Sequence, residues 1–547
     1  MKQIRPLLNS LLLAGLMVCS LLATAQVPVL APKTTTSTAG DTLVTIDIIS
    51  ARKLEMRKVN DSTQLQILAG DVKLRQGNTL FDCDSCVINN SSNTFEAWGR
   101  VHINDSDTTD VYANHLLYLT NRKIAYLDGN VKLTDGKGTL TTPDLEYAVD
   151  TKIGIYKNGG KVVNKNTVLT SKEGYYYADL KDVYFKTNVV LNDPSYYLRS
   201  DSLLYNLETE TARFIALTHI RDSSGRTIDT KEGFYNLKTG SAEFGRQPVI
   251  VDKATKVTGD NVAFDDKKGI IQISGNGSIV DTAQHTIIMG GLIYHDRINE
   301  RTFATNKPLM IIKQENDSIY ITADTLFTAR LSDLHGANDT LVKDTVKGTT
   351  VVKPENIKDS SNRYFEAYSN VKIFSDSMQS VCDSLFYSFR DSTFRLYDDP
   401  VVWAQGSQVT GDTILLFTKY KKPLRFEVFE KSFLVNRMEP GVFNQVKASR
   451  MDGYFVDGNI DSVRAKGYAE CIYFIQDEDS AFTGINESKS DIMDVYFKKQ
   501  ELHKVVFRSS VSGTLWPIRQ KDPATMRLEN FRWLESRRPK TKYELFE

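Results

Sequence analysis

The sequence predicts an all-β protein built as an elongated stack of rungs, each about 30 residues long. Three observations support this: one block of residues recurs at nearly constant spacing, the recurring segments alternate apolar and polar residues as β-strands do, and polar pairs separate them. A chain of 547 residues is too long for one ordinary globular core, so several domains or a repeat array must be present. The regular spacing favours the array.

The recurring block has eight positions. The first and sixth are apolar, the third is small, the eighth is aromatic or apolar, and the others can be any residue. Copies start at residues 81, 111, 140, 169, 198, 228, 257 and 287, in steps of 29 or 30, and others start at 49, 321, 380, 409 and, more weakly, 446. About thirteen rungs are therefore expected. Two copies are used again below: Ile49, Ala51, Leu54 and Met56, and Ile287, Met289, Leu292 and Tyr294.

The spacing inside the block predicts a rung that folds over on itself. Its first two marked positions are two residues apart, and so are its last two, but three residues separate the pairs. In an unbroken strand the second pair would face the opposite side. A bend or bulge at the intervening Asp or Asn would return both pairs to one interior. We place this bend at six residues: Asp84, Asn114, Asp144, Asp201, Asp260 and Asp324.

A second block follows about 18 residues after many of these starts. Its copies are Gly70-Asp71-Val72, Gly99-Arg100-Val101, Gly129-Asn130-Val131, Gly160-Lys161-Val162 and Gly275-Asn276-Gly277. Each repeat thus holds two short strands, joined by polar turns such as Asn121-Arg122 and Asp265-Asp266.

The amino terminus predicts secretion. Lys2 and Arg5 precede an apolar run from Leu7 to Leu22 and the small residues Ala23-Thr24-Ala25, the order of a signal peptide over residues 1–25. Cys19 leaves lipidation open as an alternative. No later segment approaches the roughly 20 apolar residues of a membrane helix, so the mature protein is expected to be soluble or peripheral.

The rest of the chain divides into five parts. We expect a flexible leader over residues 26–44, repeats over 45–330 and 363–454, a polar loop between two strands of one rung over 331–362, and C-terminal strands with a short capping helix over 455–547. The helix is placed at Ala524 to Ser536, with Met526, Leu528, Phe531 and Leu534 as its apolar residues. It would cover the last rung or dock a partner.

The phased Gly-Asn-Val and small-Asp-x-apolar-x-Tyr blocks resemble the OstA-like family, which is related to LptA and the periplasmic domain of LptD. The resemblance spans roughly residues 45 to 540. Later segments resemble the longer OstA-like proteins of Bacteroidetes: Gly467-Tyr468-Ala469-Glu470, Phe531-Arg532-Trp533 and Arg538-Pro539. The chain departs from LptD because the repeats leave no room for an outer-membrane barrel, and from LptA because it has many more rungs.

The resemblance implies a V-shaped, twisted double sheet, a β-taco or β-jellyroll. Its groove would shield the acyl chains of lipopolysaccharide or a related lipid in the periplasm of a Gram-negative bacterium, with association to the outer membrane open. Envelope transport proteins would meet its end or edge strands, and chains could associate end to end. The alternative is a structural envelope scaffold that binds partners by β-strand addition.

The expected groove is lined by the interior apolar side chains of the repeat, and the sequence leaves open whether it is an open trough or a filled core. The candidate lipid-groove residues are Phe81, Ile88, Val111, Leu116, Tyr118, Leu140, Leu145, Tyr147, Leu198, Leu203, Tyr205, Val257, Val262 and Phe264.

No motif predicts catalysis, a metal or a cofactor. Cys83-x-x-Cys86 could be a redox pair or half of a zinc site, but both cysteines fall on interior positions of the block, as core residues do. A thiol enzyme is the third hypothesis. The seven histidines show no ligand spacing and are expected at the surface. The acid pairs Asp265-Asp266 and Asp398-Asp399 are expected to be solvated turn residues. Equal numbers of basic and acidic residues, 68 each, argue against nucleic acid as a partner.

Overall fold

The structure is a computed structural model. It describes residues 45–60, 63–313, 318–334, 341–346, 349–354, 361–404, 406–419, 422–456, 459–498 and 501–546. The predicted signal peptide and nearly all of the leader lie outside these residues. The chain divides into two compact units, Met1–Ile46 and Asp47–Glu547, and the description below concerns the second.

The unit is all-β, and among the described residues no helix reaches seven residues. Its first strands are β1 (Asp47–Ser50), β2 (Lys53–Lys58), β3 (Gln64–Gln76), β4 (Thr79–Asn89), β5 (Thr94–Asp105), β6 (Thr109–Leu119), β7 (Ile124–Thr134), β8 (Thr139–Ala148), β9 (Ile153–Tyr156), β10 (Gly160–Asn164), β11 (Thr167–Ser171), β12 (Glu173–Tyr177), β13 (Asp182–Asn192) and β14 (Tyr196–Asn206). The middle strands are β15 (Thr211–Phe214), β16 (Thr218–Asp222), β17 (Thr227–Thr230), β18 (Glu232–Asn236), β19 (Ser241–Gly245), β20 (Val249–Asp252), β21 (Thr255–Thr258), β22 (Asn261–Asp265), β23 (Ile270–Asp281), β24 (Thr286–Asp296), β25 (Arg301–Thr305), β26 (Leu309–Ile312), β27 (Ile319–Thr322) and β28 (Thr325–Arg330).

After the short 3-10 turn η1 (Leu331–Asp333) come β29 (Leu341–Val346), β30 (Thr349–Pro354), β31 (Arg363–Phe374), β32 (Gln379–Ser388), β33 (Thr393–Tyr397), β34 (Val401–Ala404), β35 (Ser407–Thr410), β36 (Thr413–Lys419), β37 (Lys422–Glu439), β38 (Val442–Val456), β39 (Asn459–Gln476), β40 (Phe482–Lys498), β41 (Glu501–Arg508) and β42 (Ser512–Pro517). Four more 3-10 turns follow: η2 (Ile518–Gln520), η3 (Pro523–Thr525), η4 (Glu535–Arg537) and η5 (Glu544–Phe546).

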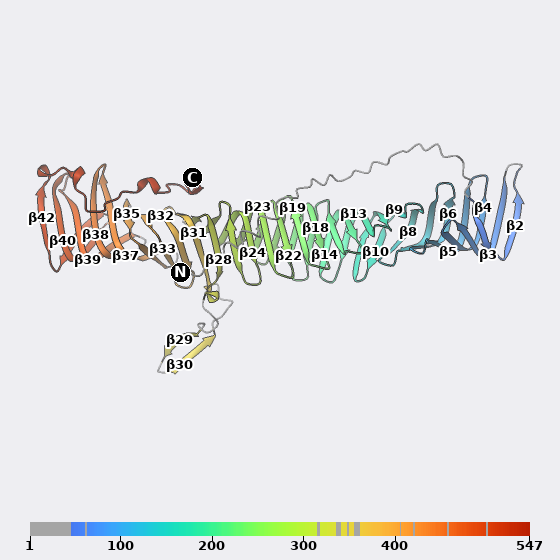
Figure 1. The fold of residues 1–547 in the computed structure, drawn as a ribbon, viewed down its shortest axis with the longest axis horizontal. Coiled ribbons are helices and arrows are strands. Elements are labelled where there is room, and N and C mark those ends of the chain that lie inside the picture. Colours follow the sequence, from blue (N-terminus) through green and yellow to red (C-terminus); the bar gives the residue numbers. More distant parts are fainter. Residues whose placement is uncertain are drawn as a thin grey trace. The chain divides into compact units, whose positions relative to one another are not determined.

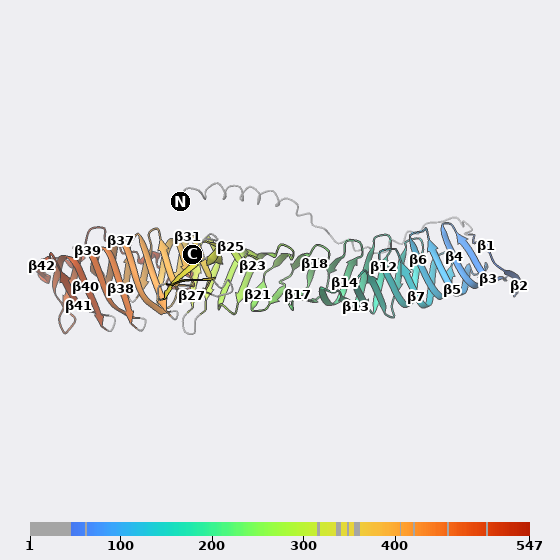
Figure 2. The same ribbon diagram turned by 90° about the horizontal axis from the view of Figure 1, so that it is seen from below.

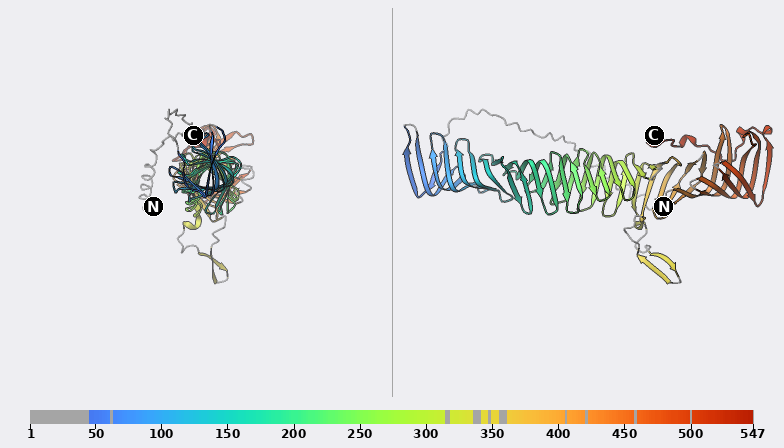
Figure 3. Two further views of the ribbon diagram at one scale, coloured as in Figure 1. Left: turned by 90° about the vertical axis from the view of Figure 1, so that its right-hand side faces the viewer. Right: turned by 180° about the vertical axis from the view of Figure 1, so that it is seen from behind.

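Forty of these strands form one sheet, in which each passage of the chain pairs antiparallel with the next. Figures 1 and 2 show the strands following one another in sequence order, and Figure 3 shows them stacked one behind another. Some passages are divided into two short strands: β9 and β10, for example, both pair with the long strand β8. We call each such passage, long or divided, a crossing.

A bulge bends the crossings near their midpoints. Gly99 and Arg100 lie opposite the single residue Asn114 and have φ of 75° and 41°. Two residues against one define a β-bulge, which bends the strand that carries it. The same step places Gly70-Asp71 opposite Asp84 and Thr187-Asn188 opposite Asp201. At Asp84, Asn114 and Asp201 the bend therefore lies where the sequence indicated, but in β8 it is Pro143, not Asp144, that lies opposite Gly129-Asn130. The extra residue belongs to the neighbouring crossing, in the second block.

Burial confirms the interior positions in most rungs. Val111, Ala113, Leu116 and Tyr118 are all buried, so both pairs of one block face the same interior despite the step of three. Two copies depart from this pattern. Ile49, Leu54 and Met56 are exposed because β1 and β2 pair only with β3 and form the edge of the described sheet.

The copy that begins at residue 287 was placed in the wrong register. Ile293 is buried and Tyr294 is 43% exposed, so the interior positions lie one residue from those expected. Ile288 pairs with the buried Ile279, and Ile293 pairs with the buried Ile273. Apolar residues occupy both faces of this strand, so the alternation could not indicate which face is buried.

The long insertion and the C-terminal segment contain structure that the sequence did not predict. The insertion follows β28 and includes the hairpin β29–β30, which forms a separate two-stranded sheet. The helix expected from Ala524 to Ser536 is not formed: η3, a turn at Glu529-Asn530 and η4 occur there, joined by irregular chain. This segment follows the sheet instead of coiling on itself, because its apolar residues pack into several rungs in succession.

Candidate functional site

Tyrosine hydroxyls join the two ends of several crossings in the N-terminal half, although the buried hydroxyls of Tyr176 and Tyr205 have no hydrogen-bond partner among the described residues. Tyr118, near the end of β6, donates to Gln76 at the end of β3. Tyr147 Oη donates to Asp105 Oδ2 at 2.9 Å, again across 42 residues of sequence. These residues lie at opposite ends of their crossings, so each crossing is bent double and its two ends meet. We call the line where the ends meet the mouth.

The fourteen candidate groove residues are all buried in the interior beneath this mouth. Around Phe81 the interior is filled, because its ring lies 4.9 Å from that of Tyr118 and 5.1 Å from that of Phe95. Further along, a β-carbon added to Gly174 would lie 2.3 Å from Tyr156 Oη. The interior is therefore tightly packed at these places. A role for the fourteen residues in lipid binding stays a prediction.

The tyrosine series ends at Phe264. Tyrosines occupy the corresponding positions at 118, 147, 176, 205 and 235, and Phe264 is the next member but has no hydroxyl. The Arg226 guanidinium lies 4.3 Å from the centre of the Phe264 ring instead. In the next rung the position belongs to His295, whose Nδ1 is 2.9 Å from Thr302 Oγ1. The closure of the mouth by tyrosine hydroxyls thus stops here.

A cavity of about 880 Å³ opens where that closure stops. Its apolar lining includes Ile250, Val257, Ile271, Ile279 and Met310, from β20 to β26, and Phe389, which follows β32. Val257 is the one candidate groove residue among its lining. Charged residues line the rest of the cavity: Arg226, Asp252, Lys253, Asp266, Asp281, Arg297, Glu300 and Arg363. The volume lies within the ~300–1,000 Å³ of small-molecule sites.

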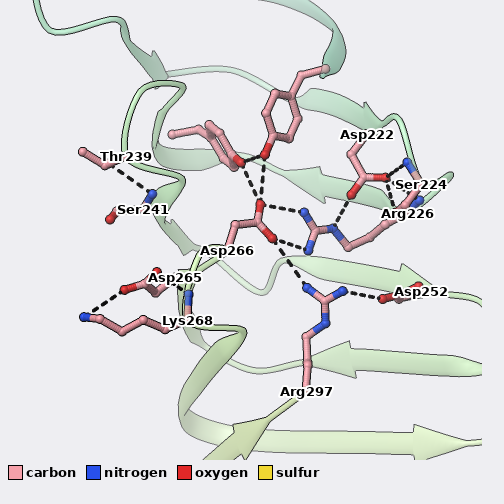
Figure 4. Close-up of polar contacts among 12 residues, drawn as sticks. Asp222, Ser224, Arg226, Thr239, Ser241, Asp252, Asp265, Asp266, Lys268 and Arg297 are labelled. Carbon is pink, nitrogen blue, oxygen red and sulfur yellow. Dashed lines mark hydrogen bonds and ion pairs between the residues drawn. The ribbon is translucent and has the colours of Figure 1, made fainter. Parts of the chain in front are cut away.

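Asp266 is the centre of the charged lining (Figure 4). Arg226 donates to both of its carboxylate oxygens, at 3.1 and 2.9 Å. Tyr196 and Tyr235 donate to Asp266 Oδ2 at 2.9 and 2.8 Å, and Arg297 lies 3.5 Å from Oδ1. The two parallel hydrogen bonds from Arg226 fix the orientation of its guanidinium group on the Asp266 carboxylate, in addition to the attraction between the charges.

Two further acids complete the cluster. Asp222 Oδ2 is 3.0 Å from Arg226 Nε, and the Arg226 side chain is only 3% exposed. Asp252 Oδ2 is 3.1 Å from a terminal nitrogen of Arg297. Each arginine is therefore held between two carboxylates. On the other side of the cavity, Glu300 accepts from Arg363 at 3.1 Å and pairs with Arg330 at 2.9 Å.

Burial and charge shift the pKa values of these groups. Burial alone would raise the pKa of Asp266, but Arg226 and the two tyrosine hydroxyls outweigh it and hold that pKa below its ordinary value. Burial lowers the pKa of Arg363. Burial, with the charges of Arg363 and Arg297, lowers the pKa of His295 to about 4. The cavity therefore holds a neutral imidazole beside paired ions at neutral pH.

Three expectations about polar residues change. Asp266, predicted to be a solvated turn residue, is the centre of the ion-pair cluster. Asp399, assigned to the same class, binds Arg532 and Arg537 from the C-terminal segment, at 2.9 and 2.6 Å. His295 lines the cavity instead of lying at the surface. The signal in the sequence that could have indicated this region is the replacement of tyrosine by Phe264 in an otherwise regular series.

The cysteines that the structure describes lie in the interior. Cys83 and Cys86 are buried free thiols, as are Cys382 and Cys471. Among the described residues, no group of three or more His, Cys, Asp or Glu side chains could hold a metal ion. Within that same part of the chain, no helix is both long and apolar enough to cross a membrane.

The fold and the cavity define a class: a stacked β-repeat protein with a partly filled interior and one large internal site. Residues 43–201 match the family of OstA-like proteins. The match covers less than half of the 547 residues. The family is one of periplasmic lipid-transport proteins of Gram-negative bacteria.

Other comparisons add little. No curated protein matches the chain. Among solved structures, the extracellular domain of a one component system from B. thetaiotaomicron aligns with 78% of this chain and 90% of that chain. The identity is 8% and the TM-score is 0.09, so this likeness carries no argument.

Proposed function

We propose that this protein is a non-enzymatic, periplasmic lipid-binding protein that shields acyl chains in its central cavity, in lipopolysaccharide transport and outer-membrane assembly. The observation that carries the proposal is the cavity of about 880 Å³, lined by both apolar and charged residues, in a chain whose residues 43–201 match OstA-like proteins.

The two kinds of lining suit an amphipathic ligand. Burial of acyl chains against Ile250, Ile271 and Ile279 contributes about 25 cal/mol for each Å² of apolar surface. Arginine is the side chain best suited to bind phosphate with two hydrogen bonds. Arg226 and Arg297 are already paired with carboxylates, so a phosphorylated headgroup would have to compete for them. We therefore expect the headgroup to lie at the mouth and the acyl chains to lie inside.

Photo-crosslinking in cells tests the proposal. A photoreactive amino acid replaces Ile288, which is half-buried and lines the cavity, and in a matched control it replaces the exposed Tyr112. We expect lipopolysaccharide or another lipid to be attached at position 288 and not at 112. Adducts with proteins alone, or equal labelling at both positions, would contradict the proposal.

A third position tests the packed part of the interior. Leu145 is a candidate groove residue that is buried beneath the tyrosine bonds. We propose that acyl chains reach it only when these bonds open, so labelling at 145 should be weaker than at 288. Equal lipid labelling at 145 and 288 would show instead that lipid occupies the whole interior.

The scaffold alternative is favoured by one observation. Among the described residues, β1 and β2 pair only with β3, and this edge exposes Ile49, Leu54 and Met56. Unpaired strand edges are sites of strand addition. A photoreactive amino acid at position 56 that labels an envelope protein, together with no lipid adduct at 288, would favour the scaffold.

A further inference from the structure

The C-terminal segment, residues 518–546, lies along the mouth of the C-terminal rungs. We call it the strap. It leaves the last strand, β42, and runs back along the unit until η5 lies against β27 and β31 (Figure 1). Its contacts therefore reach residues more than a hundred positions earlier in the sequence, such as Gln379 and Gln408.

Apolar side chains of the strap fill the interior beneath this part of the mouth. Leu528 is buried in a cluster that includes Phe433, Phe443 and Phe474. Leu534 packs on the buried Trp403, beside Val381 and Val401. Leu545, near the end of the strap, is also buried. The strap thus supplies the apolar contacts that the interior of these rungs would otherwise lack.

Two buried glutamines hold the backbone of the strap in the same way. Gln445 Nε2 donates to the Met526 carbonyl at 2.9 Å, and its Oε1 accepts from the Leu528 amide at 2.8 Å. Gln408 repeats this pattern, donating to the Arg532 carbonyl at 2.8 Å and accepting from the Leu534 amide at 2.7 Å. In the N-terminal half, tyrosine hydroxyls close the mouth; here the strap closes it.

The strap can detach from these rungs without breaking the backbone hydrogen bonds of the sheet. Over the residues that the structure describes, no strand pairs with residues 518–546, and the attachment consists of side-chain bonds and apolar contacts. Three surface ion pairs add to it, from Arg532 and Arg537 to Asp399 and from Lys447 to Glu529, and such pairs contribute little each. A sheet strand would instead be fixed by a ladder of backbone hydrogen bonds.

The end of the strap lies beside the cavity. Lys372 Nζ donates to the Glu544 carbonyl at 3.3 Å, and η5 contacts β27. β27 pairs with β26, which supplies Met310 to the cavity lining. The end of the strap therefore contacts a strand that is paired with one lining the cavity.

We infer that the trough beneath the strap is a second acyl-chain site, continuous with the cavity, and that the strap is its resident occupant until lipid displaces it. The inference rests on the proposed function. It follows from an apolar trough, an occupant without strand pairing, and the position of that occupant beside an open cavity. Displacement would lengthen the site toward the C-terminal rungs without a change in the sheet.

Quenching of Trp403 tests this inference. The chain has four tryptophans, so Trp98→Phe, Trp516→Phe and Trp533→Phe leave Trp403 as the single reporter beneath Leu534. The probe is dibromostearate, whose bromines quench indole on contact, with unbrominated stearate as the reference. We expect little quenching in the full chain and several-fold more in a chain that ends at Pro517.

A strap variant keeps the test valid if the shortened chain fails to fold. Leu528→Asp with Leu534→Asp alters the strap alone and should raise Trp403 quenching as truncation does. Tyr543→Asp, at a strap position that is 75% exposed, is the matched control and should leave quenching unchanged.

The outcomes separate the two claims. If stearate carrying a photoreactive group labels the cavity residue Ile288 in every variant, but Trp403 quenching stays at the full-chain level, the trough is not a lipid site and this inference alone is wrong. If no variant binds stearate, both the proposed function and the inference are contradicted. Strong quenching in the full chain would show that the strap does not exclude lipid from Trp403, and it would contradict the inference.

Discussion

Replacing Asp266 by Ala tests whether the ion-pair cluster supports the fold around the cavity. The change removes the acceptor of two Arg226 hydrogen bonds and of the Tyr196 and Tyr235 hydroxyls. The Arg226 guanidinium stays buried with Asp222 as its remaining acidic partner. A buried cation that loses its main partner retains its desolvation cost without the compensating attraction.

The expected magnitude follows from burial. Breaking a buried ion pair by removing one partner costs about 3–5 kcal/mol, and the Asp266 side chain is 21% exposed, which places the cost near the lower end. Asp265→Ala is the matched control. Asp265 pairs with Lys268, whose side chain is 77% exposed, and it accepts one backbone hydrogen bond. Its loss should cost about 1 kcal/mol or less.

Hydrogen exchange of the amides in β18 and β22 measures the difference, since a repeat array need not unfold as one unit. A gap of about 2 kcal/mol corresponds to about 30-fold faster exchange in Asp266→Ala than in Asp265→Ala. Equal exchange in the two variants would refute the view that Asp266 supports this region.

Three further predictions concern other parts of the chain. Gly129→Ala should lower the unfolding temperature more than Gly136→Ala, because both have φ near 75° but only at 129 does a β-carbon meet the neighbouring crossing, at 2.9 Å; equal losses would contradict this. The depressed pKa of His295 means that the unfolded chain binds more protons between about pH 4 and 6.5, so local stability should fall by about 2 kcal/mol from pH 7 to pH 5. Hydrogen exchange should show that His295→Asn loses less local stability between pH 7 and pH 5 than the unchanged protein does. Burial raises the thiol pKa of Cys382 and Cys471 to about 12 each, so neither should react with a thiol reagent at pH 8 until the protein is unfolded.

The repeat, its interior positions and its bends could be predicted because they depend on local spacing. Val111 and Tyr118 are buried as the alternation indicates, and Asn114 lies at the bend. The same alternation was ambiguous at Ile288, where both faces of the strand are apolar. Local pattern is sufficient only where one face is clearly polar.

The candidate site was largely missed, since it depends on contacts between distant residues. Arg226 and Asp266 are 40 residues apart, and nothing in the neighbourhood of Asp266 distinguishes it from the turn residue Asp265. Leu528 and Phe531 have a spacing compatible with a helix, but Gln445, 83 residues before Leu528, binds the backbone of an extended chain instead. Partners at such distances are decided by how the crossings stack.

The tyrosine hydrogen bonds across the mouth limit where a bound lipid could move. A lipid moving from the cavity toward β4 would have to break bonds such as that of Tyr147 to Asp105 and to displace packed rings such as Phe81 and Phe95. Cargo would then be loaded and unloaded through the same opening, one molecule at a time. The rate of transport by such a carrier would depend on the number of protein copies and on how quickly each copy releases its lipid.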